Sequence, residues 1–354
     1  MRTTEIHHHS TLWHTLTRQT WVLAAVGMAL LAGCGGTTDV PDPNGESEKQ
    51  SLITDDSAGK QLRIAVIPKG LSHQFWLTIK AGAEAAAKEG GAKILWQGPA
   101  KETEVEKQIN IVQDMINSKV DALVLAACDQ QALIPMVKKA RDAGIPVITI
   151  DSGIASNLAL SFVATDNVAG AKMAANTLAE LIGKSGKVGL IPFIKGAATS
   201  NMREEGFLEG IAAFPDIEVS ATLYCQSDVA KAMEVTQDML TRDADLKGIF
   251  ATNEPAAIGA AQAIKSAGKQ DQVMVVAFDA AEEEITALKS GALKALIVQN
   301  PYRMGYLGVE AALRSIAGMT IEKRIDTGVT VVTMDNFNDA KIQKLLYPLE
   351  QKRD

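Results

Sequence analysis

Two hydrophobic patterns alternate along the chain from residue 61 onward. Short runs of β-branched and aliphatic residues are followed by longer alanine-rich stretches, in which apolar residues recur every three or four positions. The first pattern is typical of strands that are buried on both faces, and the second is typical of amphipathic helices. Strands are expected at 62–67, 92–96, 122–126, 147–150, 187–191, 217–223, 248–250, 273–277 and 295–298. Helices are expected at 75–89, 104–117, 131–143, 168–182, 202–213, 230–240 and 256–266.

The alternation of strands and helices predicts an α/β fold with parallel sheets, because a helix between two strands makes a crossover connection. Gly144 and Gly268 stand directly after two of the expected helices, where glycine commonly ends a helix. The expected strands are too many for one compact sheet. The length of 354 residues also suits about two domains of typical size, so we expect two similar βα domains.

The N-terminal residues follow a different pattern. Arg2 and Arg18 precede an apolar run at 21–32, which is shorter than the roughly 20 residues that cross a bilayer. A charged region, a short apolar run and small residues in this order predict a secretory signal at 1–33. Residues 34–58 are rich in glycine, proline and polar residues, which predicts a flexible tether. The histidines at 7–9 lie in the segment to be removed and therefore indicate no metal site.

Composition excludes several classes of function. The net charge of −7 opposes nucleic-acid binding, which depends on a basic surface. Three cysteines are too few for a disulfide scaffold of this length. Hydrophobic residues make up 47% of the chain and are spread along it in short runs, so a polytopic membrane protein is excluded.

The sequence carries none of the common catalytic or cofactor-binding motifs. No Gly-x-Gly-x-x-Gly follows an expected strand, and the Gly-Lys-Ser at 183–185 lacks the earlier glycine of a phosphate-binding loop. His73 is the single histidine after the signal, and no Gly-x-Ser-x-Gly is present. Cys128 and Cys225 lack neighbours at zinc-site spacing, and we expect them to be buried packing residues. We therefore expect a protein that is not an enzyme and holds no cofactor or metal.

Polar residues follow most of the expected strands. In open parallel sheets, the loops after the strands form the ligand crevice. These loops contain Asp129, Asp151, Asn253, Asp279 and Gln299, together with the aromatic pair Phe75 and Trp76. Carboxylates accept hydrogen bonds from hydroxyl groups, amides both donate and accept, and aromatic rings offer a flat apolar surface to a sugar ring. The pattern predicts a hydrogen-bonding cage for a neutral polyhydroxyl ligand.

Several of these residues have structural alternatives. Phe75 and Trp76 are neighbours at a helix start, so we expect one of the two rings to point into the core. Asp151 and Asp279 stand between a strand and a helix and are suited to N-capping, as is Asn253. The three glutamates at 282–284 are expected to form a solvated helix face rather than a metal site.

Taken together, these motifs resemble the periplasmic sugar-binding proteins of the ribose-binding type, which are relatives of the effector domains of LacI-type regulators. The similarity runs from about Gly59 to Thr333 in sequence order. It rests on the aromatic pair at 75–76, the Val-Ile-Thr-Ile-Asp run at 147–151, the Phe-Ala-Thr-Asn run at 250–253, the Phe-Asp pair at 278–279 and Gln299. The run at 201–207 is similar to the family's arginine-containing helix start.

The resemblance adds four candidate ligand-binding residues and marks departures from ribose binders. His73 lies where those proteins have an asparagine before the aromatic pair. Ser152 and Asn201 stand where ribose binders carry arginines, and Arg203 lies slightly further along the same helix. Because a guanidinium is suited to bidentate recognition, the loss of two of them implies a different hydroxyl pattern or ligand size.

The resemblance implies two Rossmann-like parallel-sheet lobes joined by a three-strand hinge. The first lobe is expected at 59–165 and 300–327, and the second at 166–299 and 328–354. Ligand binding is then expected to close the lobes. Cys128 and Cys225 would lie near loops of opposite lobes, and we expect both to be free thiols.

The same resemblance implies a receptor that hands a monosaccharide or small polyol to an ABC permease and its ATPase. The run Leu31-Ala-Gly-Cys34 resembles the bacterial lipobox, which implies that Cys34 is lipidated and anchors a monomer to a membrane in the periplasm or cell envelope. Two alternatives belong to other classes. A LacI-type regulator needs a helix-turn-helix before residue 59, where this chain has a signal and a tether. A sensory receptor, which presents its ligand to a chemoreceptor or membrane kinase, uses the same cleft.

Overall fold

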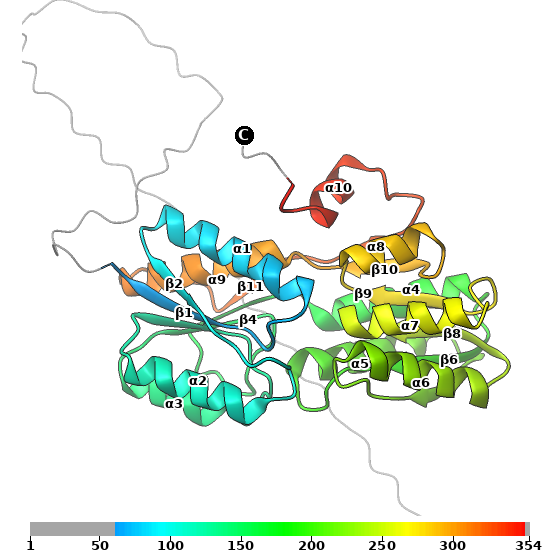
Figure 1. Cartoon of the computed structure of the whole chain (residues 1–354), viewed down its shortest axis with the longest axis horizontal. Coiled ribbons are helices and arrows are strands. Elements are labelled where there is room, and N and C mark those ends of the chain that lie inside the picture. The colour runs from blue at the N-terminus through cyan, green and yellow to red at the C-terminus, as the bar shows by residue number, and fades with distance from the viewer. Residues whose placement is uncertain (1–60, 351–354) are drawn as a thin grey trace, which may run out of the picture. The chain divides into compact units, whose positions relative to one another are not determined.

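The computed structural model describes residues 61–350, which form two six-stranded sheets with helices packed against them (Figure 1). Within each sheet the neighbouring strands run parallel, except that β12 runs antiparallel to β10. This arrangement confirms the predicted α/β fold. The predicted secretory signal, the tether and Cys34 lie outside the described residues.

The first sheet has the strand order β11-β5-β4-β3-β1-β2. Its strands are β1 (Arg63–Ile67), β2 (Lys93–Trp96), β3 (Ala122–Leu125), β4 (Val147–Ile150), β5 (Ser161–Ala164) and β11 (Arg324–Asp326). Helices α1 (Gln74–Glu89) and α9 (Pro301–Ile316) pack on one face, and α2 (Val105–Asn117) and α3 (Ile134–Asp142) pack on the other. Successive residues of β3 alternate between these two cores, which is why the whole strand is apolar.

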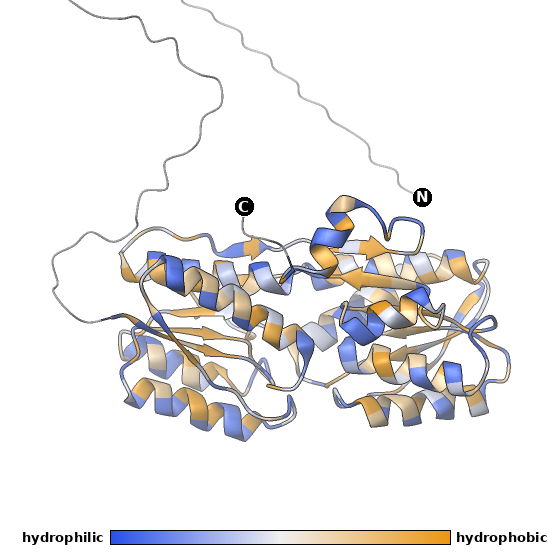
Figure 2. Ribbon diagram, turned by 45° about the horizontal axis from the view of Figure 1, so that its top comes forward, coloured by the Kyte–Doolittle hydropathy of each residue, from blue (hydrophilic) through white to orange (hydrophobic). Residues whose placement is uncertain are grey.

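The second sheet has the strand order β12-β10-β9-β8-β6-β7. Its strands are β6 (Gly186–Ile191), β7 (Ile217–Thr222), β8 (Leu246–Ala251), β9 (Met274–Phe278), β10 (Ala295–Val298) and β12 (Thr330–Val332). One hydrophobic core lies between this sheet and the helices α4 (Asn167–Leu181) and α5 (Ala198–Ile211). A second core lies between the sheet and the helices α6 (Val229–Arg242), α7 (Glu254–Ser266), α8 (Glu282–Lys289) and α10 (Ala340–Leu346). Figure 2 shows the resulting pattern, with hydrophobic strands and with polar residues on the outer sides of the helices.

Close helix packing beside the first sheet depends on two glycines. A Cβ atom on Gly82 of α1 would lie 1.9 Å from the carbonyl oxygen of Tyr302, and one on Gly305 of α9 would lie 2.0 Å from that of Ile79. Both distances are far below a van der Waals contact, so the backbones of α1 and α9 approach each other only because these side chains are absent. This packing fixes the amino end of α1, where the candidate aromatic pair lies.

The chain passes between the two sheets three times, after β5, after β10 and after β11. Near two of these passages the hydroxyls of Thr165 and Thr327 lie 3.3 Å apart. Three short strands, β5, β11 and β12, were absent from the sequence prediction, as were α9 and α10, and α5 begins at Ala198 rather than at residue 202. Among residues 61–350, no helix is both long and apolar enough to span a membrane.

Candidate functional site

Eight of the eleven candidate residues line one cavity at the carboxyl ends of strands from both sheets. These eight are His73, Phe75, Trp76, Asp151, Arg203, Asn253, Asp279 and Gln299. The cavity has a volume of about 20 Å³. It is small because the ammonium group of Lys69, which follows β1, reaches into the space between the two sheets.

Lys69 is a fully enclosed cation at the centre of this cavity. Its Nζ lies 3.2 Å from Asp151 Oδ2 and 3.0 Å from the hydroxyl of Thr199, which belongs to α5 beside the second sheet. The same Nζ lies 5.6 Å from the ring centroid of Trp76 and 4.9 Å from that of Phe193. Burial opposes the charge, but the carboxylates of Asp151 and Glu102 outweigh it and raise the pKa of Lys69. The ammonium therefore stays charged between two aromatic faces.

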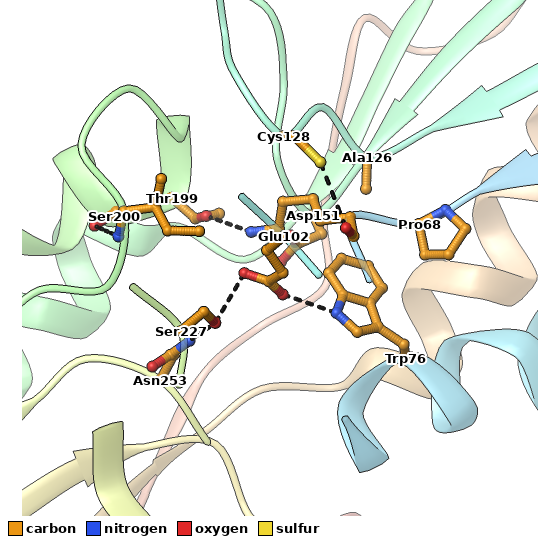
Figure 3. Close-up of polar contacts among 12 residues, drawn as sticks. Pro68, Trp76, Glu102, Ala126, Cys128, Asp151, Thr199, Ser200, Ser227 and Asn253 are labelled. Atoms are coloured by element: carbon orange, nitrogen blue, oxygen red, sulfur yellow. Dashed lines mark hydrogen bonds and ion pairs between the residues drawn. The ribbon is translucent and has the colours of Figure 1, made fainter. Parts of the chain in front are cut away.

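Glu102, from the loop between β2 and α2, connects several of these groups (Figure 3). One oxygen accepts a hydrogen bond from Trp76 Nε1 at 2.8 Å and lies 3.5 Å from His73 Nδ1. The other accepts from the Ser227 hydroxyl at 3.0 Å, and Ser227 in turn accepts from Asn253. Burial opposes ionisation, yet Lys69 and these hydrogen bonds lower the pKa of Glu102 to about 2. Glu102 is thus an ionised carboxylate that joins elements of both sheets.

Asp279 is held in a second network beside the second sheet. Its Oδ1 accepts from Gln299 Nε2 at 2.6 Å, and its Oδ2 accepts from the backbone N–H of Glu254 at 2.9 Å. Arg203 lies 4.0 Å from Oδ2 and packs with its guanidinium carbon 3.8 Å from the centroid of the Phe278 ring. The carboxylate is therefore held in one orientation by groups of the protein itself.

Asp151 and Asp279 share an uncommon backbone conformation. Their φ angles are 54° and 83°, in the left-handed region that residues with a Cβ rarely adopt. Neither residue is the N-cap of a helix, since α8 begins after Ala281 and no helix starts directly after Asp151. Strained backbone of this kind is concentrated at functional sites. Asn253, in contrast, does cap α7, with its side-chain oxygen accepting from Ala256 N–H at 3.1 Å, and it lines the cavity as well.

Glu254 links the start of α1 to the second sheet. Its two carboxylate oxygens accept from the backbone N–H groups of Gln74 and Phe75, each at 3.0 Å. His73, the N-cap of α1, makes no capping hydrogen bond with its own side chain. The N-terminus of α1 therefore receives hydrogen-bond acceptors from Glu254, which belongs to another helix.

The aromatic pair divides between two environments. Trp76 is 1% exposed and belongs to the core beside α1 and α9, although its indole N–H reaches Glu102. Phe75 is only partly buried and packs edge-on against Trp76, with ring centroids 5.0 Å apart. Of the two rings in the pair, Phe75 is therefore the more accessible one.

Three candidate residues lie outside the lining of the cavity. Asp129 accepts from the backbone N–H groups of Gln131 and Ala132, each at 2.8 Å, and so shapes its own turn. Asn201 accepts from Gly196 N–H at 3.4 Å. Ser152 is fully buried behind Asp151, and its hydroxyl has no hydrogen-bond partner within the described residues.

Sequence reasoning missed Lys69, Glu102, Thr199 and Glu254, which all line the cavity or bond across it. Lys69, Thr199 and Glu254 stand in loops that follow expected strands, and this position was the available signal. One expectation was wrong: Glu284 is fully buried rather than solvated, and its carboxylate accepts a hydrogen bond from the backbone N–H of Ala281 at the start of α8.

Cys128 and Cys225 are both buried and both free, as expected. Burial raises the pKa of Cys225 to about 11. Burial likewise raises the pKa of Cys128 well above its ordinary range. Neither thiol is therefore suited to nucleophilic chemistry near neutral pH.

The chain is similar to proteins that bind sugars. A model described as the periplasmic binding protein domain matches residues 64–320. The D-ribose/D-allose-binding protein of Pseudomonas aeruginosa is 34% identical over 283 residues, which cover 77% of this chain and 88% of that protein. The ribose import binding protein of Haemophilus influenzae is 32% identical, with 80% of this chain and 95% of that protein covered.

Solved structures show the same similarity. An ABC transporter solute-binding protein from Agrobacterium vitis, with bound D-fucose, is 40% identical, with a TM-score of 0.79 and coverage of 80% of this chain and all of that one. A carbohydrate transporter solute-binding protein from Agrobacterium radiobacter, in complex with D-arabinose, is 34% identical, with a TM-score of 0.79 and coverage of 81% of this chain and 99% of that one.

Proposed function

The chain belongs to the periplasmic binding protein family, and from this membership we propose that it is the extracytoplasmic solute-binding component of an ABC importer. Its ligand is a neutral monosaccharide or small polyol, which it delivers unchanged to a permease. The observation that carries the proposal is the placement of two buried aspartates, Asp151 and Asp279, on elements of different sheets around one cavity. Lys69 lies beside Asp151 and Arg203 lies near Asp279, and Asp279 also accepts a hydrogen bond from the Gln299 amide.

This arrangement suits hydroxyl groups better than other ligands. Each hydroxyl both donates and accepts, so it needs an acceptor such as Asp151 and a donor such as Lys69 within reach. Charge-assisted hydrogen bonds of this kind are stronger than neutral ones. A buried polar group that stays unpaired is costly, so an epimer that misplaces one hydroxyl is rejected.

The two lobes are proposed to be 59–165 with 300–327 and 166–299 with 328–354. The bonds from Glu102 to Ser227, from Lys69 to Thr199 and from Glu254 to the start of α1 then all join opposite lobes. A ligand enters by opening of the hinge and displaces the Lys69 ammonium from the centre of the cavity. It is enclosed when the bonds from Glu102 to Ser227 and from Glu254 to the start of α1 form again.

Lys69 also bears on ligand identity. Ser152 stands where ribose binders carry an arginine, and Lys69 supplies a cation to the neighbouring Asp151 from another loop. An ammonium is a point donor that cannot bind two hydroxyls in one plane as a guanidinium does. We therefore propose a sugar other than ribose. Relatives crystallised with D-fucose, D-arabinose and D-allose define the first compounds to test.

Calorimetric titration against pentoses, hexoses, 6-deoxyhexoses and polyols tests the proposed function. One compound or a small group of epimers should bind, and Asp279→Ala should weaken that binding at least about tenfold, because a charge-assisted acceptor is lost. Asp114→Ala, which changes an exposed carboxylate in α2, is the matched control and should bind as the unaltered chain does. If nothing in the panel binds, or if Asp279→Ala binds as well as the control, the proposal is wrong.

We further propose that Cys34 carries the lipid anchor of the mature protein in the periplasm. A thiol at this place follows a charged region and an apolar run, as in exported lipoproteins. Cells that express the unaltered chain should incorporate labelled palmitate into it, and cells that express Cys34→Ala should not. Equal labelling of the two chains would contradict the anchor. A chain that is exported and folded without label would show an ordinary secretory signal instead.

A further inference from the structure

A second cavity, of about 190 Å³, lies beside the first. The start of α1 bounds it on one side, and the ends of β9 and β10 bound it on another. The remaining wall is the C-terminal segment at 345–350, which comprises the end of α10 and the residues after it. The family match ends at residue 320, so this wall is built by residues outside the matched region.

The two cavities share part of their lining. Phe75, Glu254, Asp279 and Gln299 contribute to both. A molecule in the second cavity would therefore touch residues that also face the first. Because α1 belongs to the first sheet and α10 to the second, the same molecule would bridge elements of both sheets.

The lining of the second cavity is apolar in one part and acidic in another. Leu345, Tyr347 and Pro301 provide carbon surface together with Phe75. Glu254, Asp279 and Glu350 contribute carboxylates, while the lining contains no lysine or arginine from residues 61–350. Two cations lie near the lining: the Lys289 Nζ is 3.4 Å from the Tyr347 hydroxyl, and Arg203 is 4.0 Å from Asp279 Oδ2.

An unpaired acceptor also belongs to this lining. Gln299 is 2% exposed, and its Nε2 is used by Asp279, whereas its Oε1 has no hydrogen-bond partner within the described residues. A buried acceptor without a partner costs stability, which a ligand with an N–H donor would restore. Carboxylates, an unpaired carbonyl and aromatic faces together favour a donor that is positively charged.

We infer that the second cavity is a binding site for a small organic cation, namely a protonated amine attached to one ring or to a short branched chain. A cavity of about 150 Å³ accommodates benzene, so the available space suits about eight non-hydrogen atoms. The amine lies toward Gln299 and the carboxylates, and the apolar body lies against the C-terminal segment. Occupancy of this site strengthens sugar binding, because the bound molecule bridges elements of both sheets and so favours their closed arrangement.

Benzylamine is the probe, and benzyl alcohol is its neutral isostere. Calorimetry and ligand-observed NMR should show that benzylamine binds at least tenfold more tightly than the alcohol, both without sugar and with a saturating sugar from the panel. Benzylamine should also lower the Kd of the sugar by the same factor by which the sugar lowers the Kd of benzylamine. Equal affinity for amine and alcohol, or competition between amine and sugar, would overturn the inference.

Two variants locate the binding. Leu345→Trp fills the cavity and should weaken benzylamine at least tenfold, whereas Leu181→Trp, at an exposed leucine on α4, should not. Glu350→Gln should reduce the preference for amine over alcohol severalfold, and Glu322→Gln, at another exposed glutamate, should leave it unchanged. If Leu345→Trp binds benzylamine as tightly as the unaltered chain does, the proposed site is wrong. Because the amine is also measured without sugar, failure of the proposed sugar function would leave this result interpretable.

Discussion

Lys69→Met is expected to weaken monosaccharide binding about a hundredfold, which corresponds to about 3 kcal/mol. Methionine has a similar length but carries no charge, so the variant removes the donor and leaves the buried Asp151 without its cation. Lys69→Arg should recover part of the affinity, because it restores the charge with a different geometry. Calorimetric titration of the ligand found in the panel measures both changes.

Two controls separate ligand contact from a loss of structure. Lys88→Met removes an exposed lysine from the last turn of α1 and should leave the affinity unchanged. Deoxy analogues of the ligand provide the second control. One deoxy analogue lacks the hydroxyl group that Lys69 binds. For this analogue, Lys69→Met should raise the Kd only a few fold, since the analogue and the variant each remove the same hydrogen bond. A folded Lys69→Met protein with full affinity would refute the proposed role of this ammonium.

The fold followed from the sequence because most of its strands are buried on both faces. A run such as Ala122–Leu125 is entirely apolar only when helices cover both sides of the sheet. The strands that were missed are short, and two of them, β11 and β12, lie at sheet edges. Arg324–Asp326 combines charged residues with one isoleucine, because an edge strand is partly exposed and needs no continuous apolar run.

The candidate site followed from the sequence only in part. Polar residues after strands, such as Asp151 and Asn253, were found because topology brings the ends of parallel strands together. Lys69 and Glu102 were missed because a single lysine or glutamate is usually solvated. Their burial arises from partners far away in the chain, such as Thr199 and Ser227. The residues that surround Lys69 or Glu102 in the sequence do not indicate these distant partners.

Glu102→Gln is expected to lower the free energy of unfolding by about 3 kcal/mol near neutral pH, since the pKa of Glu102 lies at about 2 in the folded chain against an ordinary value of 4.5. A carboxyl with a lowered folded pKa stabilises the protein above its unfolded pKa, and this stabilisation is lost as the pH falls toward 2. The variant lacks a titrating group at this position. The difference between the two proteins should therefore shrink by about 1.4 kcal/mol for each pH unit below about 4.5.

Urea unfolding at several pH values between neutral and about 3.5 measures this difference. Glu106→Gln changes an exposed glutamate in the first turn of α2 and should shift stability by no more than about 0.5 kcal/mol. If the difference in the free energy of unfolding between Glu102→Gln and the unaltered chain stays constant with pH, the variant acts through shape or hydrogen bonding alone. If this difference becomes smaller below pH 4.5, the ionised carboxylate is the stabilising group. The same charge that holds Trp76 and Ser227 would then connect the stability of the fold to the geometry of the cavity.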